Sequence, residues 1–362
     1  MEAFRYSKVL ILNLGGLGDF ITAMPVAAAL KESGAESVTS LVWPALEEFA
    51  RVVPAIDRVA VLPRDKENDP ELTRFVLDLA GGDKFDLVLD FAFQPRAGII
   101  TRAAGGRRTL GFALDPRRYP WYTDILPNLP GQLRLDRNLD LPGHLGLPRP
   151  LRPDFSVRIP EAARLRVEKL LECHGLRLSC DRPVAVHPGS GVTRRNWPAE
   201  RFARLADKIA ESSCRPLVLL GGQRLTYDGR DETELASRVQ GLMRTPAVNL
   251  AGELDLAELT FLLKECSLFV GNNSGPAHLA ATVAGTPALL IWAPRNEVRW
   301  RPWGAKVELV YAPVHCSENC LMNDCGRIEY CLNLITVEQA FDRFTRVFAG
   351  RGAEIMTSGG GR

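Results

Sequence analysis

The chain has 362 residues, of which 46% are hydrophobic and 24% charged, with a formal net charge of +2. This length exceeds one typical domain and suits two, and the composition is that of a globular protein. The near-neutral charge gives no sign of a nucleic-acid partner, and no apolar run reaches the roughly 20 residues that span a bilayer. Residues 1–8 lack signal-peptide character, so we expect a cytoplasmic protein with mostly reduced cysteines.

The first half alternates short apolar runs with helix-forming segments, which is typical of a parallel sheet covered on both faces. Residues 9–14 predict a buried strand that leads into Gly15-Gly16-Leu17-Gly18-Asp19 and an apolar helix. The glycine spacing differs from the G-x-G-x-x-G fingerprint and disfavours a nicotinamide cofactor. Asp19 is either a first-turn residue favoured by the helix dipole or a general base at the mouth of a cleft. Further segments are predicted as strands over 37–42, 59–62 and 86–90 and helices over 20–30, 46–53 and 70–80.

Six arginines and one acidic residue lie between positions 96 and 118. Such runs are usually solvated surface, but arginine without lysine also suits bidentate pairing with phosphates or carboxylates. An anion-binding surface would draw on these residues: Arg96, Arg102, Arg107, Arg108, Arg117 and Arg118.

A proline-rich stretch over 116–160 predicts a loop and linker with one helix near 136–145. We place an N-terminal domain at 1–160 and a C-terminal domain at 175–335, with a helix over 161–174 leading into the second. The second half repeats the alternation, with strands over 183–186, 217–220, 247–250, 268–270 and 287–291 and helices over 199–211, 231–240 and 256–266.

The stretch from Leu268 to Ala280 indicates a strand, a tight turn and a helix that begins at Pro276. A turn of this kind presents backbone N–H groups and the positive end of a helix dipole. It is either an ordinary connection or an anion site.

Four segments in order resemble glycosyltransferase family 9, the lipopolysaccharide heptosyltransferase family, over about residues 8–340. Leu12-Asn-Leu-Gly-Gly-Leu-Gly-Asp19 is similar to the family's G-x-x-G-D loop. His187-Pro-Gly-Ser190 with Arg195-Asn-Trp-Pro198 is similar to its His-Pro-Gly and Trp-Pro motifs. The third segment, Leu219-Leu-Gly-Gly222, is similar to the family's Gly-Gly turn. The fourth is similar to its V-G-x-D-[ST]-G-P-x-H motif and reads Val270-Gly-Asn-Asn-Ser-Gly-Pro-Ala-His278.

The resemblance implies an α/β protein of the GT-B class, with two facing Rossmann-like domains, a helix over 336–350 that crosses back to the first domain, and a flexible tail over 351–362. It implies an inverting, metal-independent transferase without a cofactor. The donor would be ADP-heptose, and the acceptor an anionic lipid-linked glycan, the lipopolysaccharide core, at the inner membrane. We expect a monomer on the cytoplasmic face of that membrane.

The resemblance also implies roles for individual residues. Asp19 would be the base. Donor binding would involve Gly189, Ser190, Arg195, Glu253, Leu254, Asn273, Ser274, Gly275, Pro276 and His278. Acceptor binding would involve Gly16, Gly18, Arg96, Arg102, Arg107 and Arg117. His278 could equally be a buried structural histidine, and His187 is expected to be structural.

Two positions depart from the family pattern. Asn273 stands where the family has Asp, so it offers hydrogen bonds but no negative charge. Arg195 stands where the family has Lys and keeps the positive charge. Asn273 leaves three possibilities open: ADP-heptose transfer, transfer from another nucleotide sugar, or a catalytically weak homologue that binds nucleotide sugar or anionic glycan. An epimerase of the same fold has little support, because the chain has five histidines only.

Four cysteines lie close together near the C-terminus: Cys316, Cys320, Cys325 and Cys331. Four thiolates are sufficient for a structural Zn²⁺, although the paired C-x-x-C spacing of common zinc sites is missing. The alternative is a set of reduced thiols that pack a loop.

Overall fold

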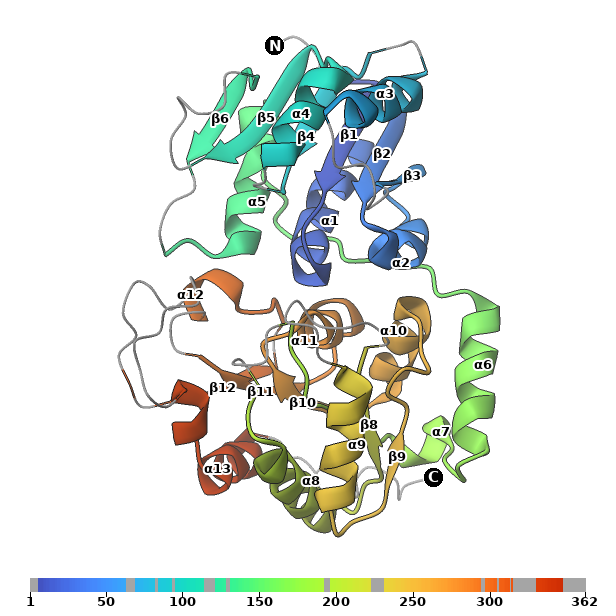
Figure 1. The fold of residues 1–362 in the computed structure, drawn as a ribbon, viewed down its shortest axis with the longest axis vertical. Coiled ribbons are helices and arrows are strands. Elements are labelled where there is room, and N and C mark those ends of the chain that lie inside the picture. Colours follow the sequence, from blue (N-terminus) through green and yellow to red (C-terminus); the bar gives the residue numbers. More distant parts are fainter. Residues whose placement is uncertain are drawn as a thin grey trace, which may run out of the picture. The chain divides into compact units, whose positions relative to one another are not determined.

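The computed structural model describes residues 6–62, 69–81, 84–92, 95–113, 121–127, 131–191, 196–222, 231–293, 297–304, 306–312, 314 and 330–347. The chain forms two compact units, Met1–Arg158 and Ile159–Arg362, and each has its own six-stranded parallel sheet with helices on both faces (Figure 1). The predicted α/β class with two parallel-sheet domains is confirmed. No helix within the described ranges is long and apolar enough to cross a membrane.

In the first unit the strand order is β3-β2-β1-β4-β5-β6. The strands are β1 (Lys8–Asn13), β2 (Ser37–Val42), β3 (Arg58–Val61), β4 (Leu87–Asp90), β5 (Arg108–Ala113) and β6 (Asp124–Pro127). The helices are α1 (Leu17–Glu32), α2 (Glu47–Arg51), α3 (Asp69–Ala80), α4 (Pro95–Ala104) and α5 (Arg134–His144), with a 3₁₀ turn, η1, at Pro44–Leu46.

Strand β1 explains why this sheet is covered on both faces. Val9 and Ile11 pack against α1 in one cluster, whereas Leu10 and Leu12 belong to a second cluster on the opposite face. This alternation buries both faces, as in parallel sheets generally. Helix α1 is buried along all of residues 20–30, so its apolar composition comes from burial on every side.

In the second unit the strand order is β12-β11-β10-β7-β8-β9. The strands are β7 (Val184–His187), β8 (Leu217–Leu219), β9 (Ala247–Asn249), β10 (Leu268–Asn272), β11 (Ala288–Trp292) and β12 (Val307–Tyr311). The helices are α6 (Glu161–Glu172), α7 (Leu178–Asp181), α8 (Ala199–Ser213), α9 (Glu232–Leu242), α10 (Leu256–Glu265), α11 (Gly275–His278), α12 (Glu297–Trp300) and α13 (Val337–Val347). A π-helical turn, η4 (Leu279–Ala284), continues α11, and a 3₁₀ turn, η7 (Cys331–Leu334), precedes α13.

Helix α13 corresponds to the helix expected over 336–350. Its residues Val337, Ala340 and Phe344 are buried in the core of the second unit, and the helix packs on α8, β11 and β12. Its apolar face is therefore used within its own unit. Over the described residues α13 belongs to the second unit, and the crossing to the first domain stays a prediction.

The strand order identifies where a ligand site is expected in each unit. Strand β1 lies between β2 and β4, and β7 lies between β8 and β10, so successive connections leave in opposite directions at these points. In open parallel sheets ligands bind beside the carboxyl ends of strands at such a switch point. The Gly15–Asp19 loop follows β1, and Asn273–Pro276 follow β10, so both sequence motifs occupy these positions.

Candidate active site

Asp19 lies in the first turn of α1, directly after the carboxyl end of β1. Its Oδ2 accepts a hydrogen bond from the Gly16 N–H over 3.2 Å, and its Oδ1 accepts one from Arg134 Nη2 over 2.9 Å. A Cβ on Gly15 would lie 2.7 Å from the Asp19 carboxylate, so glycine is required for this close approach. The side chain is 24% exposed. Both oxygens are thus positioned while the carboxylate still reaches solvent.

A buried polar network supports this corner from α5. Asn138 Nδ2 donates to the carbonyl and the hydroxyl oxygens of Thr22, each over 3.1 Å. Arg137 donates two hydrogen bonds to Asn138 Oδ1, and its guanidinium lies 4.0 Å from the centre of the Phe112 ring. The Thr22 hydroxyl in turn donates to the carbonyl oxygen of Asp19. These contacts therefore fix the position of α5 along α1 next to Asp19.

A second carboxylate, Asp90, ends the neighbouring strand β4 but is buried. Its Oδ1 accepts from the Ala92 N–H over 2.6 Å, and its Oδ2 accepts from the Tyr122 hydroxyl. Burial, and then the nearby Asp90 charge, raise the pKa of Tyr122. Tyr122 therefore stays a donor, and Asp90 is occupied by structural contacts. Of these two carboxylates, Asp19 is the one available to a substrate.

The arginines between 96 and 108 lie at two ends of the first sheet. Arg96 is in the first turn of α4, which begins after the carboxyl end of β4, whereas Arg102 is in its last turn. Arg107 and Arg108 stand at the amino end of β5, and Arg107 pairs with Asp86 over 2.9 Å. The predicted single anion-binding surface is therefore divided, because α4 runs antiparallel to the strands that it joins. Arg117 and Arg118 lie outside the described residues.

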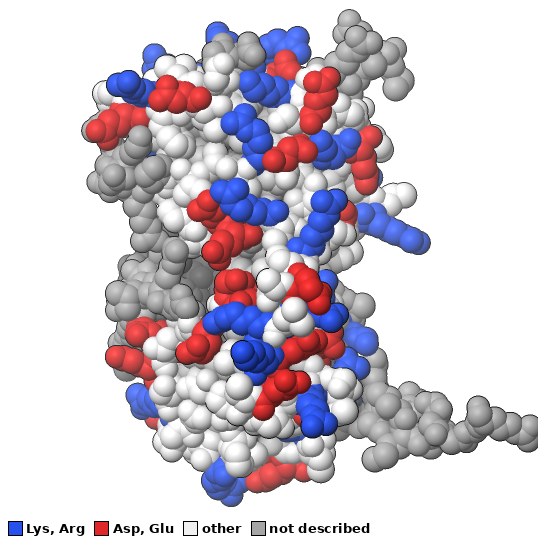
Figure 2. All heavy atoms as spheres, turned by 90° about the vertical axis from the view of Figure 1, so that its right-hand side faces the viewer, with Lys and Arg blue, Asp and Glu red and all other residues white. Residues whose placement is uncertain are grey.

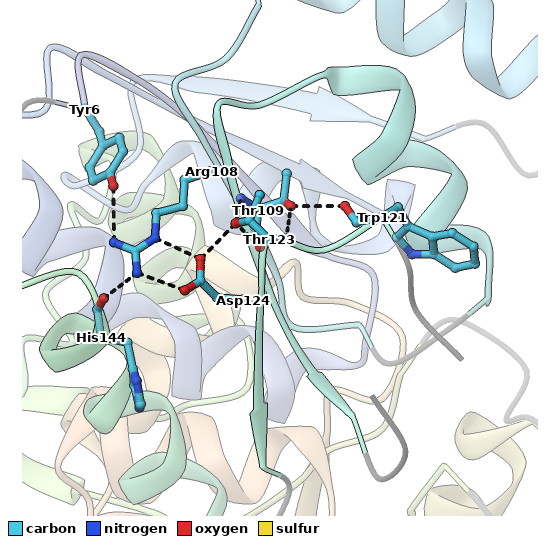
Figure 3. Close-up of polar contacts among 7 residues, drawn as sticks. All are labelled: Tyr6, Arg108, Thr109, Trp121, Thr123, Asp124 and His144. Atoms are coloured by element: carbon cyan, nitrogen blue, oxygen red, sulfur yellow. Dashed lines mark hydrogen bonds and ion pairs between the residues drawn. The ribbon is translucent and has the colours of Figure 1, made fainter. Parts of the chain in front are cut away.

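Arg108 has a structural role (Figure 3). Its guanidinium donates to both carboxylate oxygens of Asp124, to the Tyr6 hydroxyl and to the His144 carbonyl oxygen. Beside it, Thr109 and Thr123 exchange hydrogen bonds that align the starts of β5 and β6. The Arg108 guanidinium lowers the pKa of Asp124. On the face drawn in Figure 2, Lys and Arg side chains are interspersed with Asp and Glu.

In the second unit, His187 ends β7 and connects the loop after β10 with the first turn of α9. Its Nδ1 lies 3.5 Å from the Ser274 hydroxyl, and its Nε2 lies 3.4 Å from Oε2 of Glu232. Glu232 also accepts from the Gly222 N–H over 2.8 Å, and a Cβ on Gly189 would lie 2.5 Å from its Oε1. Burial opposes ionisation of Glu232, but His187 and the Gly222 N–H outweigh it and lower its pKa. An ionised carboxylate therefore stands among the predicted donor loops.

The loop after β10 is held by Asn272, which the sequence pattern did not single out. Asn272 Oδ1 accepts from the Trp197 N–H over 3.1 Å, and its Nδ2 donates to the Pro188 carbonyl oxygen over 2.6 Å. Ser274 stands at the N-cap position of α11, which comprises Gly275, Pro276, Ala277 and His278. Burial lowers the pKa of His278 to about 4, so its imidazole is neutral at pH 7.

Other predicted donor residues occupy different positions. Ser190 is buried, and Asn273 is half-buried beside Ser274. Glu253 and Leu254 follow β9 at the sheet edge, where the Glu253 carbonyl oxygen accepts two hydrogen bonds from Arg166. Arg195 lies outside the described residues.

The cysteine cluster is largely outside the described ranges, which include Cys331 but not Cys316, Cys320 or Cys325. Cys331 is buried in the core of the second unit. Within the ranges that are described, no group of three or more His, Cys, Asp and Glu side chains is arranged to hold a metal ion.

Glu232 and Arg134 are, with Asn138 and Asn272, polar residues that sequence reasoning missed. Glu232 opens a helix that was predicted to start at 231, and an acidic residue there looks like an ordinary first-turn residue. Arg134 is far from Asp19 in sequence, and no local pattern connects the two. Only the packing of α5 along α1 brings them together.

The chain is similar to lipopolysaccharide heptosyltransferases. Lipopolysaccharide heptosyltransferase 3 of Escherichia coli is 23% identical over 297 residues, which cover 79% of this chain and 83% of the relative. Lipopolysaccharide core heptosyltransferase OpsX of Haemophilus influenzae is 21% identical over 296 residues, or 81% of each chain.

Solved structures with the same fold include a glycosyl transferase family 9 protein from Veillonella parvula, with a TM-score of 0.81, 22% identity and coverage of 96% of this chain and 98% of that one. The ADP-heptose lps heptosyltransferase II of E. coli has a TM-score of 0.72 and 18% identity, and the match covers 95% of this chain and 99% of that one. The fold is therefore GT-B. The sequence pattern of glycosyltransferase family 9 (heptosyltransferase) matches residues 78–326, more than half of the chain. The protein belongs to this family and is a glycosyltransferase.

Proposed function

We propose that the protein transfers a heptose from ADP-heptose to a lipopolysaccharide core, with inversion at the anomeric carbon and with Asp19 as the general base. The observation that carries the proposal is the Asp19 carboxylate, which is partly exposed at the switch point of the first sheet and oriented by Gly16 and Arg134. The relatives named above are lipopolysaccharide heptosyltransferases, and the similar E. coli structure is that of an ADP-heptose lps heptosyltransferase.

The chemistry requires a base for the acceptor and stabilisation of the departing anion. As the acceptor oxygen forms its bond to the anomeric carbon, its proton passes to Asp19, and the bond to the donor diphosphate breaks with its electron pair on the diphosphate. Each Asp19 oxygen has a lone pair beyond the one used by Arg134 or Gly16, so a proton can be accepted without releasing either partner.

The second unit would bind the nucleotide sugar. The diphosphate would lie against the backbone N–H groups at Ser274 and Gly275, with Arg195 supplying a positive charge. Neutral His278 would donate one hydrogen bond. Glu232 is ionised and would repel a phosphate, so it suits a hydroxyl of the ribose or the sugar. We further propose that these groups are sufficient without a divalent metal ion, which predicts turnover in the presence of EDTA.

The acceptor would approach the first unit. Gly16 and Gly18 allow close backbone approach at the Asp19 corner, and Arg96 lies at the same end of the sheet. We propose Arg96 as a contact for an acidic group of the acceptor, in preference to Arg102 and Arg107. A monomer at the cytoplasmic face of the inner membrane stays a prediction.

A second candidate function is donor binding with weak or no turnover, or transfer from another nucleotide sugar. Asn273 favours it, because this position lacks the family's carboxylate and lies beside Ser274. Under this alternative the donor loops still bind a nucleotide, but ADP-heptose is not the preferred donor.

Thermal shift with ADP, UDP, GDP and their sugars separates these functions. Preferential stabilisation by ADP and ADP-heptose, together with ADP release on adding a lipopolysaccharide core acceptor, would support heptosyl transfer. Stabilisation without turnover would favour the binding homologue. If no nucleotide stabilises the protein, both functions are wrong.

A further inference from the structure

The guanidinium of Arg134 holds the proposed base. Its Nη2 donates to Asp19 Oδ1 over 2.9 Å, and the two side chains are only 14% and 24% exposed. A charge-assisted hydrogen bond at this depth is stronger and less screened by salt than a surface ion pair. Building on the proposed function, we propose that Arg134 is a positioning residue of the transfer reaction, which acts through Asp19.

The two Asp19 oxygens have different donors, and this asymmetry matters. The Gly16 N–H holds Oδ2 over 3.2 Å within the capping turn of α1, whereas Arg134 holds Oδ1 from another helix. One donor alone would leave the carboxylate free to turn about its own bonds. Two donors on opposite oxygens fix its plane, which sets the direction from which a hydroxyl proton is accepted. Catalysis depends strongly on this kind of alignment.

Helix α5 is built to hold Arg134 in this place. Arg134 and Asn138 are four residues apart and therefore lie on the same face of α5. Asn138 is 1% exposed and donates to Thr22, three residues after Asp19 on α1. The two helices are thus joined at two successive levels, Arg134 with Asp19 and Asn138 with Thr22. The Asn138–Thr22 pair holds the two helices together, and the Arg134–Asp19 pair orients the carboxylate.

Exposure separates Arg134 from Arg149, another arginine that pairs with a carboxylate in this region. Arg149 contacts Asp136 and Asp140 of α5, but it is 48% exposed and pairs with carboxylates that are 42% and 41% exposed. Surface pairs of this kind contribute little. Arg149 therefore serves as a matched control, an arginine–carboxylate contact of α5 outside the site.

The test uses kcat of the full chain with ADP-heptose and a core acceptor, and ADP binding by thermal shift. In Arg134→Ala we expect kcat to fall about 100-fold, because small misplacements at the reacting centre have effects of this order. ADP affinity should not change, since the proposed donor site is in the other unit. Guanidinium ion at concentrations far below denaturing should restore part of kcat. Arg134→Lys should lie between Arg134→Ala and the wild type, and Arg149→Ala should match the wild type.

A double-mutant cycle decides whether Arg134 acts through Asp19. In the Asp19→Asn background, adding Arg134→Ala should cause no further loss. A full additional loss, or a wild-type kcat in Arg134→Ala beside an inactive Asp19→Asn, would overturn this inference and leave the proposed function intact. Retained turnover in Asp19→Asn would instead remove the base itself. If Arg134→Ala does not fold, Arg134→Lys alone still tests the proposal, because a wild-type kcat there contradicts it.

Discussion

The family motifs lie at the carboxyl ends of the strands in both sheets, and the carboxylates there have different surroundings. In the first unit, Asp19 pairs with a permanent cation, Arg134, and keeps 24% of its side chain exposed. In the second, Glu232 contacts an imidazole, His187, and is enclosed by loops that leave no room for a Cβ at Gly189.

The contrast suits Asp19 to proton transfer and Glu232 to recognition of the donor. A partly exposed carboxylate with a fixed plane meets the geometric requirement for a base. A carboxylate held between the end of β7 and the loop after β8 instead passes a displacement on to the loop after β10, because His187 also contacts Ser274. Substitutions around Asp19 in the first unit should therefore affect kcat, and substitutions around Glu232 in the second unit should affect donor affinity.

The largest expected effect comes from Asp19→Asn. The amide keeps the shape of the side chain but accepts no proton, so kcat should fall about 1,000-fold, within the range of general-base contributions. ADP binding, measured by thermal shift, should stay within about twofold of the wild type. If Asp19→Asn also loses nucleotide binding, the proposal that the first unit supplies the base and the second unit binds the donor is contradicted.

The buried imidazole of His278 should make the second unit sensitive to acid. Burial lowers its pKa from 6.5 to about 4. As pH falls below 6.5 the unfolded chain binds a proton first, so the free energy of unfolding decreases until pH 4 and is unaffected above 6.5. The loss is at most on the order of 3 kcal/mol, at about 1.4 kcal/mol per pKa unit.

Urea unfolding between pH 7.5 and 4.5 measures this effect as a difference between variants. In His278→Gln the decrease toward acid should be smaller than in the wild type. His174→Gln, which makes the same substitution at an exposed position, is the matched control. Equal slopes for all three proteins would show that His278 is not the group responsible.

Gly189→Ala should weaken donor binding without a large change in kcat at saturating donor. The added Cβ would lie 2.5 Å from Glu232 Oε1, so the carboxylate must move away from the Gly222 N–H and from His187. We expect about a tenfold rise in the ADP dissociation constant, or about 1.4 kcal/mol. Gly241→Ala is the control: it lies in helix α9, where a Cβ meets nothing within 4 Å, and should bind ADP normally.

Much of the fold was predictable, because both sheets are made of short buried runs. The continuous apolar stretch before Gly15 and the one before Gly271 can only be central strands, with glycine turns after them. Strands β5 and β6 were missed, since arginines and prolines dominate their surroundings. Arg108 looked like one member of a charged surface, yet its pairing with Asp124 is a structural contact between neighbouring strands.

The candidate site was predictable only as far as local motifs extend. The loop at Asp19 and the turn at Ser274 are each contained in a few residues. The partners of these loops come from other helices and strands: Arg134 is 115 positions from Asp19, and His187 is 87 from Ser274. Contacts at this separation follow from the packing of whole elements and have no local sequence signal.

The smallest predicted effect concerns the arginines of the first unit. Arg96 lies at the Asp19 end of the sheet and Arg107 at the other end, paired with Asp86 at 69% exposure. Arg96→Gln should raise the acceptor KM two- to threefold, or by about 0.5 kcal/mol, and reduce the dependence of KM on salt, because one charge contact is lost. Arg107→Gln should leave acceptor KM and its salt dependence as in the wild type, since the pair that it breaks is a surface pair. If Arg107→Gln raises KM and Arg96→Gln does not, the acceptor binds at the amino end of the sheet, and the proposal that it reaches Asp19 is wrong.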